Sequence, residues 1–378
     1  MDNIRCTNCK NPYPDEGIPY RCPECGGVFD FTGELPYQPG KDLKAHGIWC
    51  YRQNFGLPST LPEISLGEGN TPLVWVDYVG NHAGKKVAFK CEFLEPSGSF
   101  KDRGSALIAS FLVDRGVKVA LEDSSGNAGA SFAAYAARAG IQARIFIPDS
   151  ASGPKRSQIE IYGAEVIPIP GIREKATQAL IDTLEKAQPA QKPIIAYASH
   201  AYLPFNIPGY ATLAYELCEQ LGEIPGTVVT PVGQGGLLLG IGRGYQAMQA
   251  AGYISKMPVL IGAQAEACAP LWAVSTFRQV DMRLFAGRET IAEGICVQYP
   301  VRGDEVLKVV DASGGKFITV NEDEILMGRS WLGKKGLFVE PTSAVVWSAL
   351  DKLMDTLPEP IVAVLTGSGL KTKSFPIR

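Results

Sequence analysis

The chain alternates short, apolar, β-branched runs with amphipathic stretches, and this alternation limits the folds that it can adopt. Such runs occupy residues 86–93, 117–123, 143–148, 165–169, 193–197, 227–231, 258–265 and 361–366, and helical patterns fill 131–140, 154–163 and 173–187. Strands that alternate with helices favour a mainly parallel sheet covered by helices on both faces. The sequence therefore predicts an α/β protein, whose 378 residues suit two or three subdomains better than one core.

Charge and composition exclude several classes of partner. The formal net charge is −3, so no basic surface for nucleic acid or an anionic membrane is expected. The first residues, MDNIRCTNCK, are too polar for a signal peptide, and no apolar run reaches the roughly 18 residues of a membrane span. We therefore expect a cytoplasmic protein. With only three histidines, a histidine-ligated catalytic metal or a Ser-His-Asp triad is disfavoured.

Four of the nine cysteines form two Cys-x-x-Cys pairs near the N-terminus, Cys6 with Cys9 and Cys22 with Cys25. Four thiolates at this spacing are typical of the closed tetrahedral site of structural Zn²⁺. Because sulfur fills every coordination position, we expect a structural and not a catalytic metal. Zinc ribbons also bind nucleic acids and proteins, but few basic residues surround this one.

Three glycine-rich turns follow predicted strands, at residues 124–131, 231–240 and 365–372. A turn of small residues ahead of a helix exposes backbone N–H groups that suit a phosphate or carboxylate, although each turn alone also fits ordinary close packing. GQGGLLLG lacks the third glycine of the dinucleotide fingerprint, and Leu370 stands where a P-loop requires glycine. The turns thus favour a phosphate-bearing cofactor other than a nucleotide.

Lys101 lies in the stretch EPSGSFKDRG, directly ahead of a predicted helix. A lysine amine whose pKa is lowered can form a Schiff base with a carbonyl cofactor. The ordinary alternative is a solvated surface lysine. The stretch supplies small neighbours and a helix start, and from these residues alone both interpretations stay open.

Six segments together resemble a known family. GEGNTPL (67–73), EPSGSFKDRG (95–104), SSGNAGAS (124–131), PVGQGG (231–236), EPTSA (340–344) and LTGSGLK (365–371) occur in the order found in threonine synthases, which are fold type II pyridoxal-phosphate enzymes of the tryptophan synthase β-chain family. The resemblance implies two three-layer α/β subdomains with mainly parallel sheets. The smaller would hold residues 34–66 and 103–205, and the larger, cofactor-binding one residues 67–102 and 206–378. Residues 1–33 would form a zinc-ribbon-like module.

The resemblance also implies roles for individual residues. Lys101 would form the internal aldimine and shuttle protons, and Asn127 would hydrogen-bond the phenolic oxygen of the cofactor. The hydroxyl of Thr366 would face the pyridine nitrogen, which suits β-elimination and replacement. The resemblance further implies that the cofactor phosphate is bound by the backbone of Gly233, Gln234, Gly235, Gly236 and Leu237. The substrate would be bound by Ser124, Ser125 and Lys155. Helix capping is the alternative role of the two serines.

The substrate is less constrained than the cofactor. Three positions depart from the family pattern. Ser368 stands where the family has histidine, Ala128 where it has threonine or serine, and Asn206 where it has arginine. Arg156 and Arg173 are the candidates to replace the missing arginine, with surface charges as the alternative.

The first expectation is a threonine synthase, which converts O-phosphohomoserine and water to threonine and phosphate. The alternatives are a threonine or serine dehydratase type of ammonia-lyase, a β-replacement enzyme of the cysteate synthase type, or a zinc-ribbon binding protein with a degenerate catalytic body. We expect a small-molecule amino-acid substrate and no nucleic-acid or membrane partner. Relatives are often dimers, so a homodimer is a further expectation.

Overall fold

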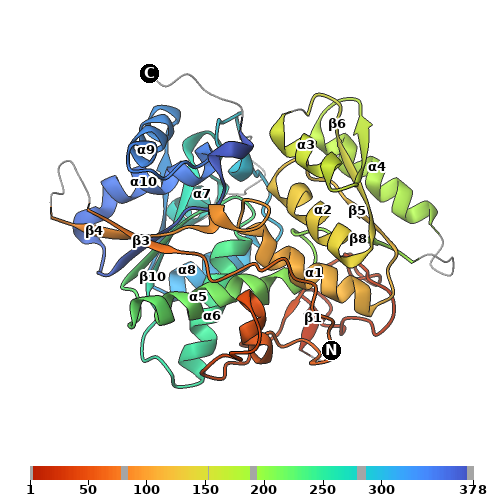
Figure 1. The fold of residues 1–378 in the computed structure, drawn as a ribbon, viewed down its shortest axis with the longest axis horizontal. Helices are drawn as coiled ribbons and strands as arrows, with labels where there is room; N and C mark the ends of the chain where they lie inside the picture. Colours follow the sequence, from red (N-terminus) through yellow and green to blue (C-terminus); the bar gives the residue numbers. More distant parts are fainter. Residues whose placement is uncertain (1–2, 78–83, 152, 188–193, 279–286, 373–378) are drawn as a thin grey trace. The chain divides into compact units, whose positions relative to one another are not determined.

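The computed structural model describes residues 3–77, 84–151, 153–187, 194–278 and 287–372, and the chain divides into two compact units (Figure 1). Unit 1 comprises Met1–Glu68 and Lys101–Gly209, and unit 2 comprises Gly69–Phe100 and Tyr210–Arg378. The sequence analysis placed the boundaries between the smaller and larger subdomains after residues 66, 102 and 205. Lys101, which the prediction assigned to the larger subdomain, is instead the first residue of the second segment of unit 1. Residues 1–33 also belong to unit 1.

The sheet of unit 1 has four parallel strands. Their order is β7 (Glu165–Ile169), β6 (Gln142–Pro148), β5 (Val119–Glu122) and β8 (Ile195–Tyr197). Alternate strand residues face opposite sides, so Leu121 and Phe146 pack with Leu180 of α4 (Arg173–Lys186) on one face. Helix α2 (Asn127–Ala139) also contacts β5 and β6, and it packs against α1 (Lys101–Asp114) and α3 (Pro154–Ile161).

The N-terminal module is a small hairpin that packs against the rest of unit 1. Strands β1 (Ile4–Cys6) and β2 (Phe29–Phe31) pair antiparallel. The ring of Tyr13 packs edge-on at 5.2 Å from Phe205 and 6.1 Å from Phe111 of α1. Arg115, just after α1, donates to the carbonyls of Pro14 and Asp15. The module is therefore anchored to the helix that begins at Lys101.

The sheet of unit 2 has six strands, all parallel except for the edge strand β3. The order is β11 (Lys316–Val320), β10 (Val259–Ala265), β9 (Thr227–Pro231), β12 (Ile361–Val364), β4 (Lys86–Lys90) and β3 (Leu73–Asp77). Its longer helices are α5 (Ile207–Leu221, which begins in unit 1), α6 (Gly236–Ala250), α8 (Gly303–Ala312), α9 (Glu322–Lys334) and α10 (Pro341–Leu353), and α7 (Pro270–Phe277) is shorter. Helices α9 and α10 lie on one side of the sheet, and α5, α6 and α8 lie on the other (Figure 1).

The predicted α/β alternation is confirmed, with strands at all eight predicted runs; Pro193 of one run lies outside the described residues. Edge strand β3 was not predicted, because its LVWVD sequence is largely exposed and too short to stand out as a buried run. Among the described residues, no helix combines the length and apolarity that a bilayer span requires.

Candidate functional site

Four of the sequence motifs meet within unit 2. Phe100 N–H donates to the Thr366 carbonyl at 3.0 Å, and Ser368 N–H donates to the Gly98 carbonyl at 3.0 Å. These bonds join EPSGSF to LTGSGLK. Glu340 N–H donates to the Gly367 carbonyl at 3.0 Å, which adds EPTSA, and Gly69 N–H donates to the Glu95 carboxylate, which adds GEGNTPL. Motifs that are far apart in the sequence thus form one hydrogen-bonded group of loops.

The predicted phosphate-binding loop precedes α6 and is shaped by glycines. Gly235, the N-cap, has a left-handed φ of 79° and provides no side-chain cap, so the first N–H groups of α6 receive no capping bond from it. A Cβ at Gly235 would lie 2.5 Å from Val306, and one at Gly233 would lie 2.9 Å from the Cα of Ile295. Gln234 accepts from Val301 N–H at 2.9 Å, so its side chain holds the loop. The loop presents backbone donors, as an anion site requires.

Thr366 lies in the loop after β12, and its hydroxyl is paired with that of Ser343. Their oxygens are 3.0 Å apart, and Thr366 is 2% exposed. Ser343 also accepts from Gly367 N–H at 2.8 Å. The motif EPTSA contains Ser343, so the signal was present in the sequence, but its contact with Thr366 was not predicted.

In unit 1, Lys101 begins α1 and is half-buried. Burial lowers the pKa of Lys101 to about 8; the charge of Glu122 opposes this effect and that of Arg173 adds to it. A larger fraction of neutral amine at neutral pH makes Lys101 a better nucleophile than an ordinary lysine.

The loop SSGNAG leads from β5 into α2, whose first residue is Asn127. Ser124 accepts from Gly126 N–H at 3.2 Å, which is a local turn and not a helix cap. A Cβ at Gly129 would lie 1.8 Å from the carbonyl oxygen of Ser124, so only glycine fits there. The loop is therefore folded tightly against the start of α2, with Ser125 in its half-buried part.

Acidic residues close to Lys101 were not among the predicted site residues. Glu122 ends β5 and is 2% exposed, and its Oε2 has no hydrogen-bond partner among the described residues. Burial raises the pKa of Glu122 well above its usual range, and the charge of Asp123 adds to this. Asp123 accepts from the hydroxyl of Thr177 at 2.6 Å. Burial therefore favours the neutral form of the Glu122 carboxyl.

The basic side chains that are candidates to bind the substrate phosphate differ in their surroundings. Arg156 forms an ion pair with Glu160 at 3.0 Å, and Lys155 is half-buried beside it in the first turn of α3. Arg173, at the start of α4, is close enough to Lys101 to lower its pKa. Asn206 is buried and donates to the His200 carbonyl at 2.7 Å. Of the two arginines, Arg173 is the one whose charge acts on Lys101.

The four predicted zinc ligands converge. Their sulfur atoms all lie within 4.8 Å of one another, with Cys6 to Cys25 at 3.4 Å and Cys9 to Cys22 at 3.6 Å. Sulfurs about 2.3 Å from a tetrahedral Zn²⁺ would be about 3.8 Å apart. A Cβ at Gly27 would lie 2.7 Å from the sulfur of Cys6, so the knuckle needs glycine there. The thiols fit a tetrahedral metal.

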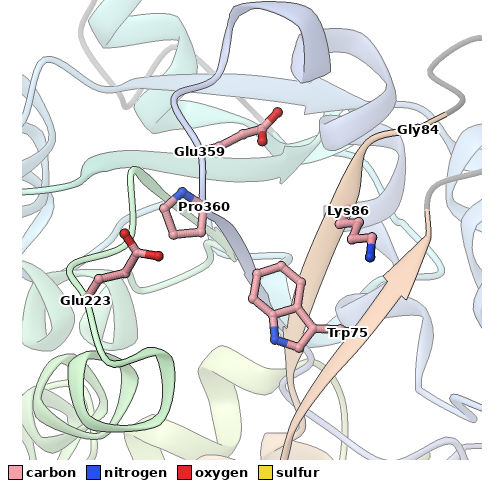
Figure 2. A pocket seen from close by; sticks show the side chains of 6 residues that line it. All are labelled: Trp75, Gly84, Lys86, Glu223, Glu359 and Pro360. Carbon is pink, nitrogen blue, oxygen red and sulfur yellow. The ribbon is translucent and has the colours of Figure 1, made fainter.

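An open depression of about 400 Å³ in unit 2 is lined by six residues. Figure 2 shows these residues: Trp75, Gly84, Lys86, Glu223, Glu359 and Pro360. Glu359 and Pro360 directly precede β12, so the depression lies at the amino ends of parallel strands. Ligands of open α/β sheets bind at the carboxyl ends. The loops after β9 and β12, which carry Gly233 and Thr366, lie at those carboxyl ends.

Comparison with known proteins gives one family. Residues 64–367 match the model of the family described as pyridoxal-phosphate dependent enzyme. A threonine synthase of Methanocaldococcus jannaschii is 32% identical, over 99% of this chain and 94% of the relative. The threonine synthases of Synechocystis sp. (33%, over 86% of this chain and 82% of the relative) and Mycobacterium leprae (31%, over 88% and 91%) are similar relatives.

Solved structures agree at the level of the fold. An O-acetylserine dependent cystathionine beta-synthase from Helicobacter pylori has a TM-score of 0.66 at 23% identity, covering 82% of this chain and 96% of that one. A fungal L-serine ammonia-lyase from Rhizomucor miehei has a TM-score of 0.66 at 20% identity, covering 79% and 93%. Enzymes with several reactions therefore share this fold.

Proposed function

The chain belongs to the pyridoxal-phosphate-dependent enzymes and is a lyase of that family, and from this premise we propose that it is a threonine synthase. The reaction would convert O-phosphohomoserine and water to threonine and phosphate. The observation that carries the proposal is the match to a threonine synthase over 99% of this chain.

We assign the cofactor to the residues that carry the family motifs. Lys101 would hold pyridoxal phosphate through its amine, and Asn127 would bind its phenolic oxygen. The backbone N–H groups of Gly233, Gln234, Gly235, Gly236 and Leu237 would bind the phosphate. The uncapped start of α6 and the close-packed glycines of that loop support this assignment.

The protein residues would then divide the work of catalysis. The bound cofactor supplies an electron sink for a carbanion at the substrate α-carbon. The Lys101 amine, whose pKa is about 8, would take the α-proton and return it at a later step. The Thr366 hydroxyl, supported by Ser343, would face the ring nitrogen. Ser124 and Ser125, with their loop amides, would bind the substrate carboxylate.

The phosphate of the substrate needs cations. Arg173 and Lys155 would supply them, because the Asn206 amide donates to a main-chain carbonyl and Arg156 pairs with Glu160. An enzyme of the threonine or serine dehydratase type is the second candidate, because a buried asparagine at position 206 replaces the arginine expected for a phosphate substrate.

Two assays separate these functions. Purified protein incubated with O-phosphohomoserine should release threonine and phosphate in equal amounts. Release of 2-oxobutyrate or pyruvate from threonine or serine, with no activity on O-phosphohomoserine, would favour the dehydratase. Reduction with borohydride followed by peptide mass spectrometry should place the cofactor on Lys101; a label on another lysine would overturn the site.

We also propose that Cys6, Cys9, Cys22 and Cys25 bind one structural Zn²⁺. The packing of Tyr13 and the bonds of Arg115 support a role in bracing α1. Metal analysis of the purified protein should find about one zinc per chain.

A further inference from the structure

A chain of four buried polar side chains runs between α1, α2 and the segment after β8. Ser131 donates to the Asp102 carboxylate at 2.6 Å. The hydroxyls of Ser105 and Ser131 are 2.6 Å apart, and Ser105 is 2.9 Å from Nε2 of His200. The acid and both serines have no exposed surface, and His200 is 8% exposed. Asp102 and Ser131 lie in the motifs EPSGSFKDRG and SSGNAGAS, but Ser105 and His200 lie outside every motif, and the members are up to 98 residues apart.

The donors in this chain have a single consistent direction. A hydroxyl has one proton, and that of Ser131 is committed to Asp102. Ser131 therefore accepts from Ser105, and Ser105 in turn accepts from Nε2–H of His200, whose ring also interacts with the backbone of Lys101. Burial lowers the pKa of His200 well below its usual range, so the imidazole is neutral. Its Nδ1 then carries the lone pair and has no hydrogen-bond partner among the described residues.

The serines occupy related positions in the two helices. Ser105 lies four residues after Lys101 in α1, and Ser131 lies four residues after Asn127 in α2. Residues four apart lie on the same face of a helix. The bond between Ser105 and Ser131 therefore joins the helices one turn C-terminal to Lys101 and Asn127, the two residues proposed to hold the cofactor.

We propose that Asp102, Ser131, Ser105 and His200 are positioning residues, whose directed chain of hydrogen bonds sets Lys101 of α1 against Asn127 of α2. The inference rests on the proposed function for the roles of Lys101 and Asn127, but the chain itself does not. Ordinary packing of two helices would tolerate a slide or rotation of one along the other. A buried chain of hydrogen bonds with one allowed direction does not tolerate such a movement, because any displacement of one helix leaves a buried hydroxyl without its partner.

The first experiment tests the direction of the chain without the cofactor. Because the protein has only three histidines, ¹⁵N-histidine labelling gives few ring signals in an NMR spectrum. We expect one neutral histidine with a slowly exchanging proton on Nε2. Ser105→Ala should speed the exchange of that proton, and Ser110→Ala should not, since Ser110 of α1 is equally buried but accepts from Ile64 N–H. A neutral His200 protonated on Nδ1 would overturn the chain.

The second experiment tests positioning in the holoenzyme. Contact between Asn127 and the phenolic oxygen affects the ratio of the long- and short-wavelength absorption bands of the bound cofactor. Ser105→Ala and Ser131→Ala should each change this ratio about fivefold, the effect of one ordinary hydrogen bond on an equilibrium. The double variant should match the single ones, and Asp102→Asn, which keeps an acceptor, should lie closer to wild type. If Ser131→Ala does not fold, Ser105→Ala alone decides.

The outcomes are distinguishable. If wild-type protein carries the cofactor on Lys101 but Ser105→Ala absorbs like Ser110→Ala at equal Tm, the positioning role is wrong and the proposed function stands. If wild-type protein carries no cofactor on Lys101, both fail, whatever the histidine spectra show of the chain.

Discussion

The hydroxyls of Ser343 and Thr366 lie 3.0 Å apart in unit 2, and Ser343 also accepts from the backbone N–H of Gly367. Ser343 Oγ also lies 3.2 Å from the Gly367 carbonyl, to which it can donate, and either hydroxyl of the Ser343–Thr366 pair can donate to the other. A residue of α10 thereby orients a hydroxyl in the loop after β12. The proposed contact of Thr366 with the cofactor ring depends on this pair.

Ser343→Ala should therefore weaken cofactor binding. Loss of one buried hydrogen bond is worth about 1 kcal/mol, so the dissociation constant measured by absorbance titration should rise about fivefold. Ser348→Ala is the matched control, because Ser348 lies in the same helix and donates to the Glu324 carbonyl at 2.7 Å. Equal weakening in both variants would mean that Ser343 acts only through the stability of α10.

Arg173→Gln should raise the pKa of Lys101 above about 8, because it removes a positive charge that disfavours the ammonium form. The pH dependence of cofactor capture by the apoprotein reports this pKa, and the midpoint should move to higher pH. Arg156→Gln should leave the midpoint in place, since that arginine pairs with Glu160. A midpoint that moves to lower pH in Arg173→Gln would contradict the electrostatic argument.

Lys101→Met should stabilise the apoprotein at neutral pH. The folded-state pKa of about 8 is below the ordinary value of 10.5, so the unfolded chain binds more protons between these values and the contribution of Lys101 to stability rises with pH. The gain in Tm from the substitution should be largest below pH 8 and shrink toward pH 10.5. A gain that is independent of pH would point to packing and not to charge.

Gly129→Ala should disrupt the loop before α2, because the new Cβ would lie 1.8 Å from the carbonyl oxygen of Ser124. We expect a loss of about 3 kcal/mol or more in the free energy of unfolding, measured with denaturant. Gly333→Ala in α9 has no atom within 4 Å of its new Cβ and should be neutral or gain up to about 1 kcal/mol. Similar stability of the two variants would argue against the loop geometry.

Cys9→Ser should abolish stoichiometric zinc and lower Tm, because the free energy of metal binding contributes to folding. Zinc is measured by elemental analysis of protein purified without chelators. Cys50→Ser is the control in the same unit, since Cys50 lies outside the cluster. Zinc retained in Cys9→Ser, or absent from wild type, would contradict a four-cysteine site.

Local signals in the sequence predicted much of this molecule, and contacts between distant segments account for the rest. The run EVIPI appears as β7 with the predicted bounds, because the strand follows from its own apolar, β-branched residues, although it is only partly buried at the edge of its sheet. The four cysteines were predicted to meet because all of them lie within residues 6–25, in two Cys-x-x-Cys pairs. By contrast, Ser105 and His200 lie in no motif, and nothing in the sequence predicts that they contact Ser131 of SSGNAGAS. Glu122 likewise looks like a surface acid in the sequence, and only the sheet buries it.

Strand β4 pairs with β3 on one side and with β12 on the other, so that Val87 lies opposite Ile361. During synthesis β4 leaves the ribosome long before β12 exists. Its open edge must stay unpaired until nearly the whole of unit 2 has emerged, whereas the strands of unit 1 are complete by residue 197. Such distant pairing slows folding and exposes an apolar edge to other chains. Nascent chains of this protein should therefore be most prone to aggregation while the edge of β4 is still unpaired. A chaperone that shields a single strand would act at that stage.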